Sequence, residues 1–178
     1  MIDSPPGFAG GRPHPCSGGP QGPQSGHGPV DRARQGSKHH VLTDGQGIPL
    51  AVSLTGGDRN DVTQLLPLLG EVPAVSGVVG RPGHRPDALL AGRGYGRDKY
   101  RRLPRQRGRR PVTAERGQAH GSGPGVFRYV VERTSAWLHG FRRLRICWGI
   151  RDDIHDAFLT PGNALICRRR PRSRCRPV

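Results

Sequence analysis

Aromatic and acidic residues are both scarce in this chain of 178 residues. Only 5% of the residues are aromatic and 33% are hydrophobic, which leaves little material for a large core. Acidic side chains number 13 against 29 lysines and arginines, so the formal net charge is +16. A charge of that sign attracts polyanions, and nucleic acid is the commonest of them. An arginine-rich coding bias with no binding role is the alternative.

Paired cysteines and long apolar runs are also lacking. The cysteines at 16, 147, 167 and 175 form no C-x-x-C pair, so neither a zinc finger nor a disulfide framework is expected. No apolar run approaches the ~20 residues of a membrane-spanning helix. The first residues have no charged-then-apolar pattern of the kind that directs secretion. We therefore expect a cytoplasmic protein that does not enter a membrane.

Glycine and proline are abundant, and they concentrate near the N-terminus. The chain has 28 glycines and 18 prolines, a share that approaches the range of low-complexity sequences. Residues 5–29 show neither helical nor strand periodicity, so we expect 1–29 to be disordered. The arginine-rich segment 168–178 is expected to be a solvated or phosphate-bound tail. These boundaries leave 30–167 as the ordered domain.

Hydrophobic periodicity within that domain predicts alternating strands and helices. Strands over 40–43 and 48–54 flank Asp44-Gly45, a pair typical of a hairpin turn. The next elements are a helix starting at Asn60 or Asp61, a strand over 88–91, a short basic helix interrupted by Pro104 and a strand over 111–114. This order predicts an α/β domain with a mixed sheet.

The strongest periodicity predicts a long helix over 126–145. Its apolar stripe is expected to pack on one face of the sheet and includes Trp137, Leu138 and Phe141. Its polar face carries Arg128, Glu132 and His139. By spacing alone, Arg128 and Glu132 form an ordinary helical ion pair four residues apart. A second helix is expected over about 152–165, weakened by Pro161-Gly162.

Three segments carry a more specific signal: SKHHVLTDGQGIPLAVSLTGGDRNDVTQLLPLL, LLAGRGYGRDKYRRL and FRYVVERTSAWLHGFRRLRI. In order and spacing they resemble bacterial insertion-sequence transposases of the DDE type. The resemblance covers residues 30 to about 168. It implies a ribonuclease H-like mixed sheet flanked by helices, as in the retroviral-integrase superfamily. It also implies a fold that is incomplete at the N-terminus, because the DNA-binding region preceding the core in complete transposases is absent.

The resemblance implies a chemistry based on two aspartates and one glutamate. In the family these carboxylates hold two divalent ions, Mg²⁺ or Mn²⁺, which drive DNA strand cleavage and transfer. Glu132 matches the glutamate, with Arg128 before it and His139 where a basic residue is usual. Gly92 stands where the phrase resembling A-D-R-G-Y-D has its aspartate. We therefore expect a lost metal ligand, unproductive ion binding and no strand cleavage.

The first aspartate of the family has one candidate in this chain. The segment Met1-Ile2-Asp3-Ser4 resembles the start of the family phrase I-D-S-S-H, which makes Asp3 the candidate catalytic and metal-binding residue. A chance match at the start of a disordered tail is the alternative, and both stay open. A stretch read out of frame and later restored would explain why the following residues do not resemble the family.

The implied partner is DNA, specifically insertion-sequence ends, and the resemblance leaves a homo-oligomer open. The candidate DNA-binding side chains are Arg128, His139, Arg142, Arg143 and Arg145, with the last three also suited to a helix C-terminus. His39 and His40 are expected to face solvent or phosphate rather than a metal, since neighbouring strand residues point to opposite faces.

Two other functions stay open at this point. One is a non-catalytic, basic nucleic-acid-binding protein derived from a transposase. The other is a non-functional product of a decayed gene.

Overall fold

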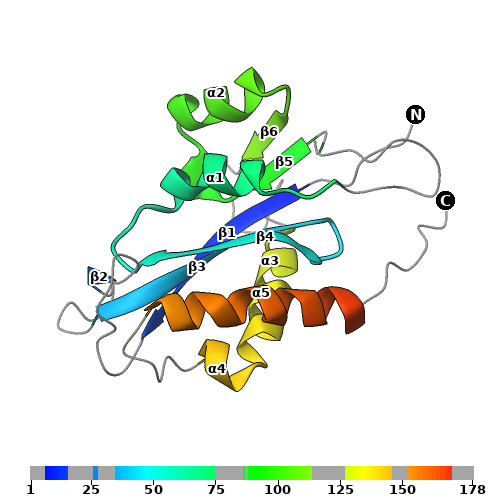
Figure 1. The fold of residues 1–178 in the computed structure, drawn as a ribbon. Helices are drawn as coiled ribbons and strands as arrows, with labels where there is room; N and C mark the ends of the chain where they lie inside the picture. The colour runs from blue at the N-terminus through cyan, green and yellow to red at the C-terminus, as the bar shows by residue number, and fades with distance from the viewer. Residues whose placement is uncertain are drawn as a thin grey trace.

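The computed structural model describes residues 7–15, 26–27, 35–74, 86, 88–113, 127–145 and 152–169. Its strands are β1 (Gly7–Pro15), β2 (Gly26–His27), β3 (Gln35–Thr43), β4 (Pro49–Gly56), β5 (Ala88–Ala91) and β6 (Arg110–Thr113). Its helices are η1 (Asp61–Gln64), α1 (Leu65–Gly70), η2 (Arg93–Tyr95), α2 (Asp98–Gln106), α3 (Arg128–His139), α4 (Arg142–Arg145) and α5 (Asp152–Arg169). Figure 1 shows the sheet between two sets of helices.

The sheet is mixed, as the sequence predicts. Its main strands lie in the order β4-β3-β1-β5-β6, and β2 pairs with the first residues of β3. Strand β3 runs antiparallel to β1 and β4, whereas β1, β5 and β6 are mutually parallel. Parallel strands need crossover connections, and α2 lies in the connection between β5 and β6.

Strand β1 contradicts the expectation that 5–29 holds no regular structure. The strand lies between β3 and β5, so its backbone is paired although its sequence has no periodicity. Only Gly7 to Ala9 pair with β5, so the far end of β1 pairs with β3 alone. Pro13 and Pro15 lie in that far end, where a missing N–H can face the unpaired side. Neighbouring strands, rather than composition, therefore define this element.

The two faces of the sheet support separate hydrophobic cores, because side chains alternate along each strand. Leu42 of β3 and Leu89 of β5 pack on the α1 side, against Leu65, Leu68 and Leu69. Val41 and Leu54 pack on the other side, against residues of α3, α4 and α5: Leu138, Leu144, Leu159 and Ile166. Figure 1 shows α1 above the strands and α3, α4 and α5 below them.

The helix predicted over 126–145 is two helices instead of one. Helix α3 ends at His139, and α4 begins at Arg142. The backbone N–H of Gly140 still bonds the carbonyl oxygens of Ala136 and Trp137 at 3.1 Å, and the chain then turns. Glycine favours such an end because it is a poor helix former. The turn brings Phe141 and Leu144 against the same core as Leu138.

The predicted apolar stripe of this segment is confirmed in part. Leu138 is buried, and half-buried Trp137 and Phe141 pack against the same core. Phe127, at the start of the stripe, is 44% exposed and lies just before α3. The second helix extends further than expected, since α5 continues through Pro161 to Arg169.

The β3–β4 hairpin has the predicted turn, and Asp44 holds it closed. The Asp44 Oδ1 atom accepts hydrogen bonds from the backbone N–H groups of Gln46 at 2.9 Å and Ile48 at 2.8 Å. The Gly47 N–H bonds the Asp44 carbonyl oxygen at 3.0 Å. Gly47 has a φ of 81°, a conformation that glycine adopts without a steric penalty.

Candidate functional site

Gly92 lies directly after β5 and begins the turn into η2. Its backbone is extended, with φ −69° and ψ 176°, and its carbonyl oxygen accepts a hydrogen bond from the Tyr95 N–H at 3.0 Å. A Cβ atom built at this position meets no other atom within 4 Å. An aspartate therefore fits here without strain or collision, and nothing in the local backbone requires glycine.

Strand β1 runs parallel to β5 and passes the carboxyl end of β5. Ala9 lies opposite Ala91 in the parallel register, so Gly10 is the β1 residue that follows at the level of Gly92. The sequence of β1, GFAGGRPHP, contains neither aspartate nor glutamate. Asp3, the predicted first ligand, precedes β1 and lies outside the described residues. Neither β1 nor β5 therefore provides a carboxylate at the carboxyl end of β5.

Helix α3 packs on β5 close to Gly92. Val130 is fully buried, and it shares a small core with Leu90 and with the half-buried Val112 and Val131. Leu90 precedes Gly92 by two residues, so a side chain at position 92 points to the same face, toward α3. Glu132 follows Val130 by two residues, so its side chain is turned about 200° around the helix axis from that of Val130.

Glu132 itself makes a surface ion pair. The Arg128 Nε atom lies 2.9 Å from Glu132 Oε1, and the two side chains are 68% and 41% exposed. A pair of this exposure and spacing contributes only a few tenths of a kcal/mol, roughly 0.3–0.5. The contact orients the carboxylate and leaves it accessible from solvent.

The carboxylates in the described segments do not fit a centre for two divalent ions. No three His, Cys, Asp or Glu residues come close enough there to hold one metal ion. Glu132 has no carboxylate neighbour from β1 or β5, and hard cations such as Mg²⁺ prefer several oxygen ligands. The described segments therefore bring together no set of oxygen ligands around Glu132.

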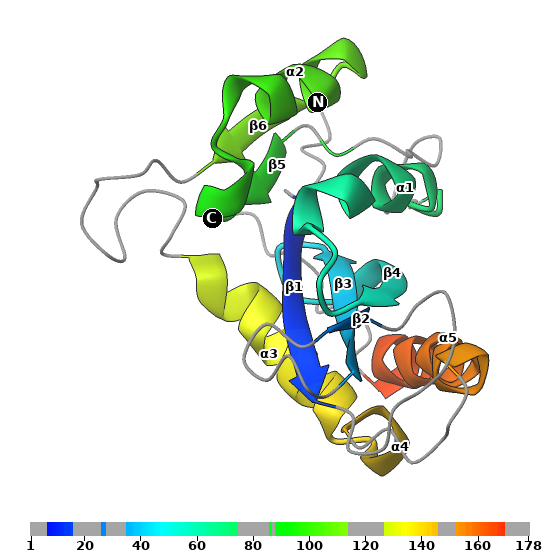
Figure 2. The ribbon, with the colours of Figure 1, turned by 90° about the vertical axis from the view of Figure 1, so that its left-hand side faces the viewer.

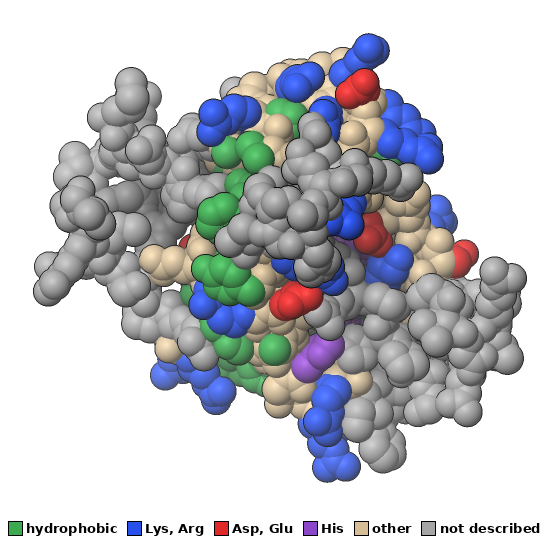
Figure 3. Space-filling model, turned by 180° about the vertical axis from the view of Figure 1, so that it is seen from behind, with side chains coloured by type: hydrophobic (Ala, Val, Ile, Leu, Met, Phe, Trp, Pro, Cys, Tyr) green, Lys and Arg blue, Asp and Glu red, His purple; other side chains and the backbone are tan. Residues whose placement is uncertain are grey.

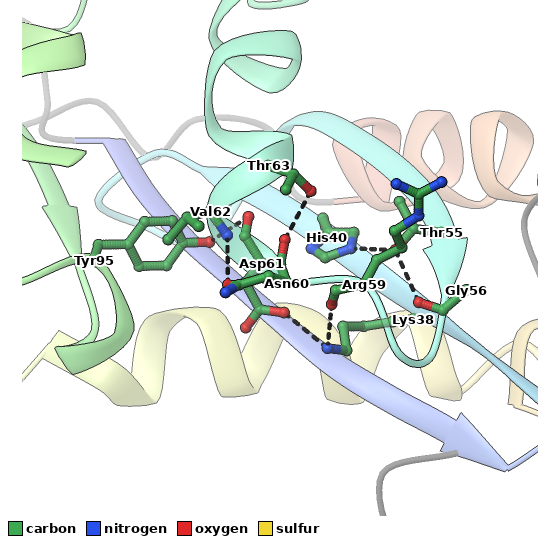
Figure 4. Close-up of polar contacts among 10 residues, drawn as sticks. All are labelled: Lys38, His40, Thr55, Gly56, Arg59, Asn60, Asp61, Val62, Thr63 and Tyr95. Carbon is green, nitrogen blue, oxygen red and sulfur yellow. Dashed lines mark hydrogen bonds and ion pairs between the residues drawn. The ribbon is translucent and has the colours of Figure 1, made fainter. Parts of the chain in front are cut away.

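A polar network holds the segment before α1 against β3 and η2 (Figure 4). The Lys38 Nζ atom donates to Asp61 Oδ1 and to the Arg59 carbonyl oxygen, each at 3.0 Å. The Tyr95 hydroxyl donates to the Asp61 carbonyl oxygen at 3.2 Å. Because Tyr95 lies three residues after Gly92, this network fixes the turn that follows β5. The N-cap of η1 is Asn60, one of the two residues proposed for that place.

The sequence gives no signal for this network, since Lys38 and Tyr95 are far from Asp61 along the chain. Burial raises the pKa of Tyr95 well above its ordinary range, and the Asp61 carboxylate adds to that effect. The tyrosine therefore stays a neutral hydrogen-bond donor. Its role here is to position the turn after β5.

His39 and His40 are buried, so the expectation that they face solvent or phosphate is wrong. They do point to opposite faces, as predicted: His40 Nε2 lies 2.7 Å from Thr55 Oγ1, and His39 Nε2 lies 2.8 Å from Nε2 of His155 on α5. Burial lowers the pKa of His40 from 6.5 to about 4 and also lowers the pKa of His155. The His39 contact joins β3 to α5, whereas the His40 contact joins β3 to the neighbouring strand β4.

The predicted DNA-binding arginines of the last helical segment lie on α4. Arg142, Arg143 and Arg145 are exposed, while Leu144 between them is buried in the core. Arg143 also lies over the ring of Phe158 at 5.3 Å. His139 is half-buried at the end of α3.

Most of the chain has clear relatives. The sequence profile of the transposase DDE domain matches residues 11–160, a range that contains Gly92 and Glu132 and begins after Asp3. The chain therefore belongs to the DDE transposases of bacterial insertion sequences. It is 56% identical over 145 residues to a putative transposase for insertion sequence element IS402 of Burkholderia cepacia, which covers 82% of this chain and 69% of that protein. None of the helices in the described segments is long and apolar enough to cross a membrane.

Proposed function

We propose that this chain is a catalytically inactive, DNA-binding member of its transposase family. The observation that supports the proposal most is that neither β5 nor the neighbouring β1 provides a carboxylate at the carboxyl end of β5. Two-metal phosphoryl transfer holds its ions about 4 Å apart, which requires ligands shared between them. Glu132 alone cannot supply such a set.

A ribonuclease H-like core is part of the same proposal. Its support is the mixed sheet with helices on both faces, together with the packing of α3 on β5 through Val130 and Leu90. In such a core, α3 would bring Glu132 to the carboxyl end of β5, near position 92. The family's ions would be Mg²⁺ or Mn²⁺. This chain would not bind them in a way that supports cleavage.

The test of inactivity is a cleavage assay with the full chain. Labelled duplex DNA carrying insertion-sequence ends is incubated with the protein and Mg²⁺ or Mn²⁺, and no nicking or strand transfer is expected. Cleavage by the unmodified chain that disappears in Glu132→Ala would overturn the proposal. Cleavage that survives Glu132→Ala would instead indicate a contaminating nuclease.

Restoring carboxylates tests the proposed ligand positions. Gly92→Asp is expected to bind Mn²⁺ about tenfold more tightly than Gly94→Asp, which adds the same charge to the same turn. Both positions have room, since neither Cβ meets an atom within 4 Å. Adding Gly10→Asp is expected to tighten binding further, because residue 10 follows Ala9, which lies opposite Ala91.

The same binding assay tests whether Asp3 is the first ligand. If Asp3 is the ligand, Asp3→Asn removes the gain in Mn²⁺ affinity made by Gly92→Asp. If Asp3 is not a ligand, Asp3→Asn leaves that gain intact.

Non-catalytic binding of nucleic acid is the function that the charge favours. The formal net charge of +16 predicts weak, sequence-independent association with DNA that weakens with salt. A decayed, unfolded product is distinguished from both readings by far-UV circular dichroism, which would then lack helical signal.

A further inference from the structure

A second basic surface lies on and around α2, away from the arginines of α4. Its exposed cations are Arg97, Lys99, Arg102, Arg105, Arg107 and Arg110, called here the α2 surface. Asp98 is the only acidic residue between Ala88 and Thr113. Figure 3 shows Lys and Arg side chains gathered at the α2 end of the molecule, with little acidic surface among them.

Some cations of this region make structural contacts, among them the exposed Arg107, whose Nη1 atom donates to the Leu66 carbonyl oxygen at 3.3 Å. The Arg101 Nε atom donates to Thr113 Oγ1 at 2.8 Å, which ties α2 to β6. The buried Arg109 donates to the Leu69 carbonyl oxygen at 3.4 Å. Arg102 and Arg105, in contrast, project from α2 into solvent. So many like charges on one exposed helix repel one another, and a polyanion would relieve that repulsion.

The α2 surface and α4 lie at opposite ends of the molecule. Figures 1 and 2 place α2 beside β6 at one end and α4 at the other, with the sheet between them. Tyr100 of α2 packs against the core on the α1 side, whereas Leu144 of α4 packs in the core on the α5 side. The α2 surface and α4 are therefore separate basic surfaces, with the sheet between them (Figure 1 and Figure 2).

We propose that the α2 surface binds the phosphate backbone of duplex DNA independently of α4, so that a single chain holds two DNA segments. This inference rests on the proposed DNA-binding function and adds the number and place of the contacts. Helix α2 spans about 13 Å at 1.5 Å per residue. Each strand of a duplex carries one phosphate per roughly 3.4 Å of duplex axis, so that length spans about four base-pair steps.

A bridging assay with the full chain tests the inference. One duplex is fixed to beads, the protein is bound, and a fluorescent second duplex is added. The unmodified chain is expected to retain the second duplex. Arg102→Gln/Arg105→Gln is expected to stay on the beads through α4 but to lose the second duplex.

Two further variants make the assay specific. Arg142→Gln/Arg143→Gln should also lose bridging, because it removes the other surface. Arg168→Gln/Arg169→Gln changes the charge equally at the end of α5 and should keep bridging. Circular dichroism of each variant checks that it is folded. Light scattering should find one 19.3 kDa chain in each bridged complex.

Several results would overturn the inference. They are bridging that persists in Arg102→Gln/Arg105→Gln, an equal loss of bridging in the α5 variant, or two chains per complex. If the unmodified chain binds no duplex at all, the proposed function fails as well. If it binds but the α2 variant behaves identically, only the α2 surface is excluded.

Discussion

The Thr134 hydroxyl of α3 donates a hydrogen bond of 2.6 Å to the carbonyl oxygen of Gly47 in the β3–β4 turn. Beside it, an Arg133 guanidinium nitrogen donates to the Gln46 carbonyl oxygen, also at 2.6 Å. These contacts join the helix that carries Glu132 to a turn far away in the sequence. The turn therefore sets the position of α3 on the sheet.

Gly47→Ala is expected to destabilise the protein by about 2–4 kcal/mol. The left-handed backbone costs roughly 1–2 kcal/mol for a residue with a Cβ atom. That atom would also lie 3.0 Å from Thr134 Oγ1 and 3.3 Å from the Val130 carbonyl oxygen. Gly108→Ala is the control, since Gly108 has a φ of 69° but open space around it. If urea unfolding shows equal losses of stability for Gly47→Ala and Gly108→Ala, the close contacts of the Cβ atom at position 47 add nothing, which contradicts the prediction.

Leu138→Ala is expected to cost about 2–5 kcal/mol of unfolding free energy, in the range of large-to-small core substitutions. Leu138 is 1% exposed and packs with Val41 and Leu144 between α3, α4 and the sheet. Leu165→Ala removes the same atoms from a side chain that is 38% exposed and should cost much less. Similar midpoints for the two variants would show that the α3 layer is not a packed core.

Acid should weaken the fold between about pH 6.5 and pH 4 through His40. Its folded pKa of about 4 lies below the unfolded value of 6.5, so the unfolded chain binds the proton first. Stability from this residue is complete above the unfolded pKa and is lost as pH falls toward the folded one. The loss is about 3 kcal/mol at most, at 1.4 kcal/mol per pKa unit. Thermal unfolding of His40→Gln across this range should show a shallower pH dependence.

Glu132→Gln should change stability by less than about 1 kcal/mol, because its pair with Arg128 is exposed. Thermal unfolding of the single variants and of Glu132→Gln/Arg128→Gln measures the coupling between the two side chains. A small coupling means that any functional effect of Glu132 reflects its carboxylate rather than the fold. A loss of several kcal/mol would contradict the exposed geometry.

The sequence predicts the local elements well, because periodicity and turn residues act over short distances. The β3–β4 hairpin, β5 and the helix containing Leu138 follow from such patterns. The break at Gly140 was missed because the apolar stripe continues through Phe141 to Leu144. Nothing local distinguishes a turn that brings both residues onto one core from a straight helix.

Long-range contacts account for the remaining differences. Strand β1 has no strand pattern, and β3 and β5 define it by backbone pairing. The burial of His39 depends on His155, 116 residues away along the chain. For the candidate site, family resemblance identifies Gly92 and Glu132, but only the register of β1 with β5 points to position 10.

The place of β1 also has a kinetic consequence. The β3–β4 hairpin closes over a few residues, whereas β1 joins the sheet through pairs as distant in sequence as Phe8 with Leu90. Closing so large a loop carries its entropy cost before any contact rewards it. The hairpin is therefore the natural folding nucleus, and the central strand is among the last to be inserted. Until then, β3 and β5 present unpaired edges to other chains, which makes slow refolding prone to aggregation.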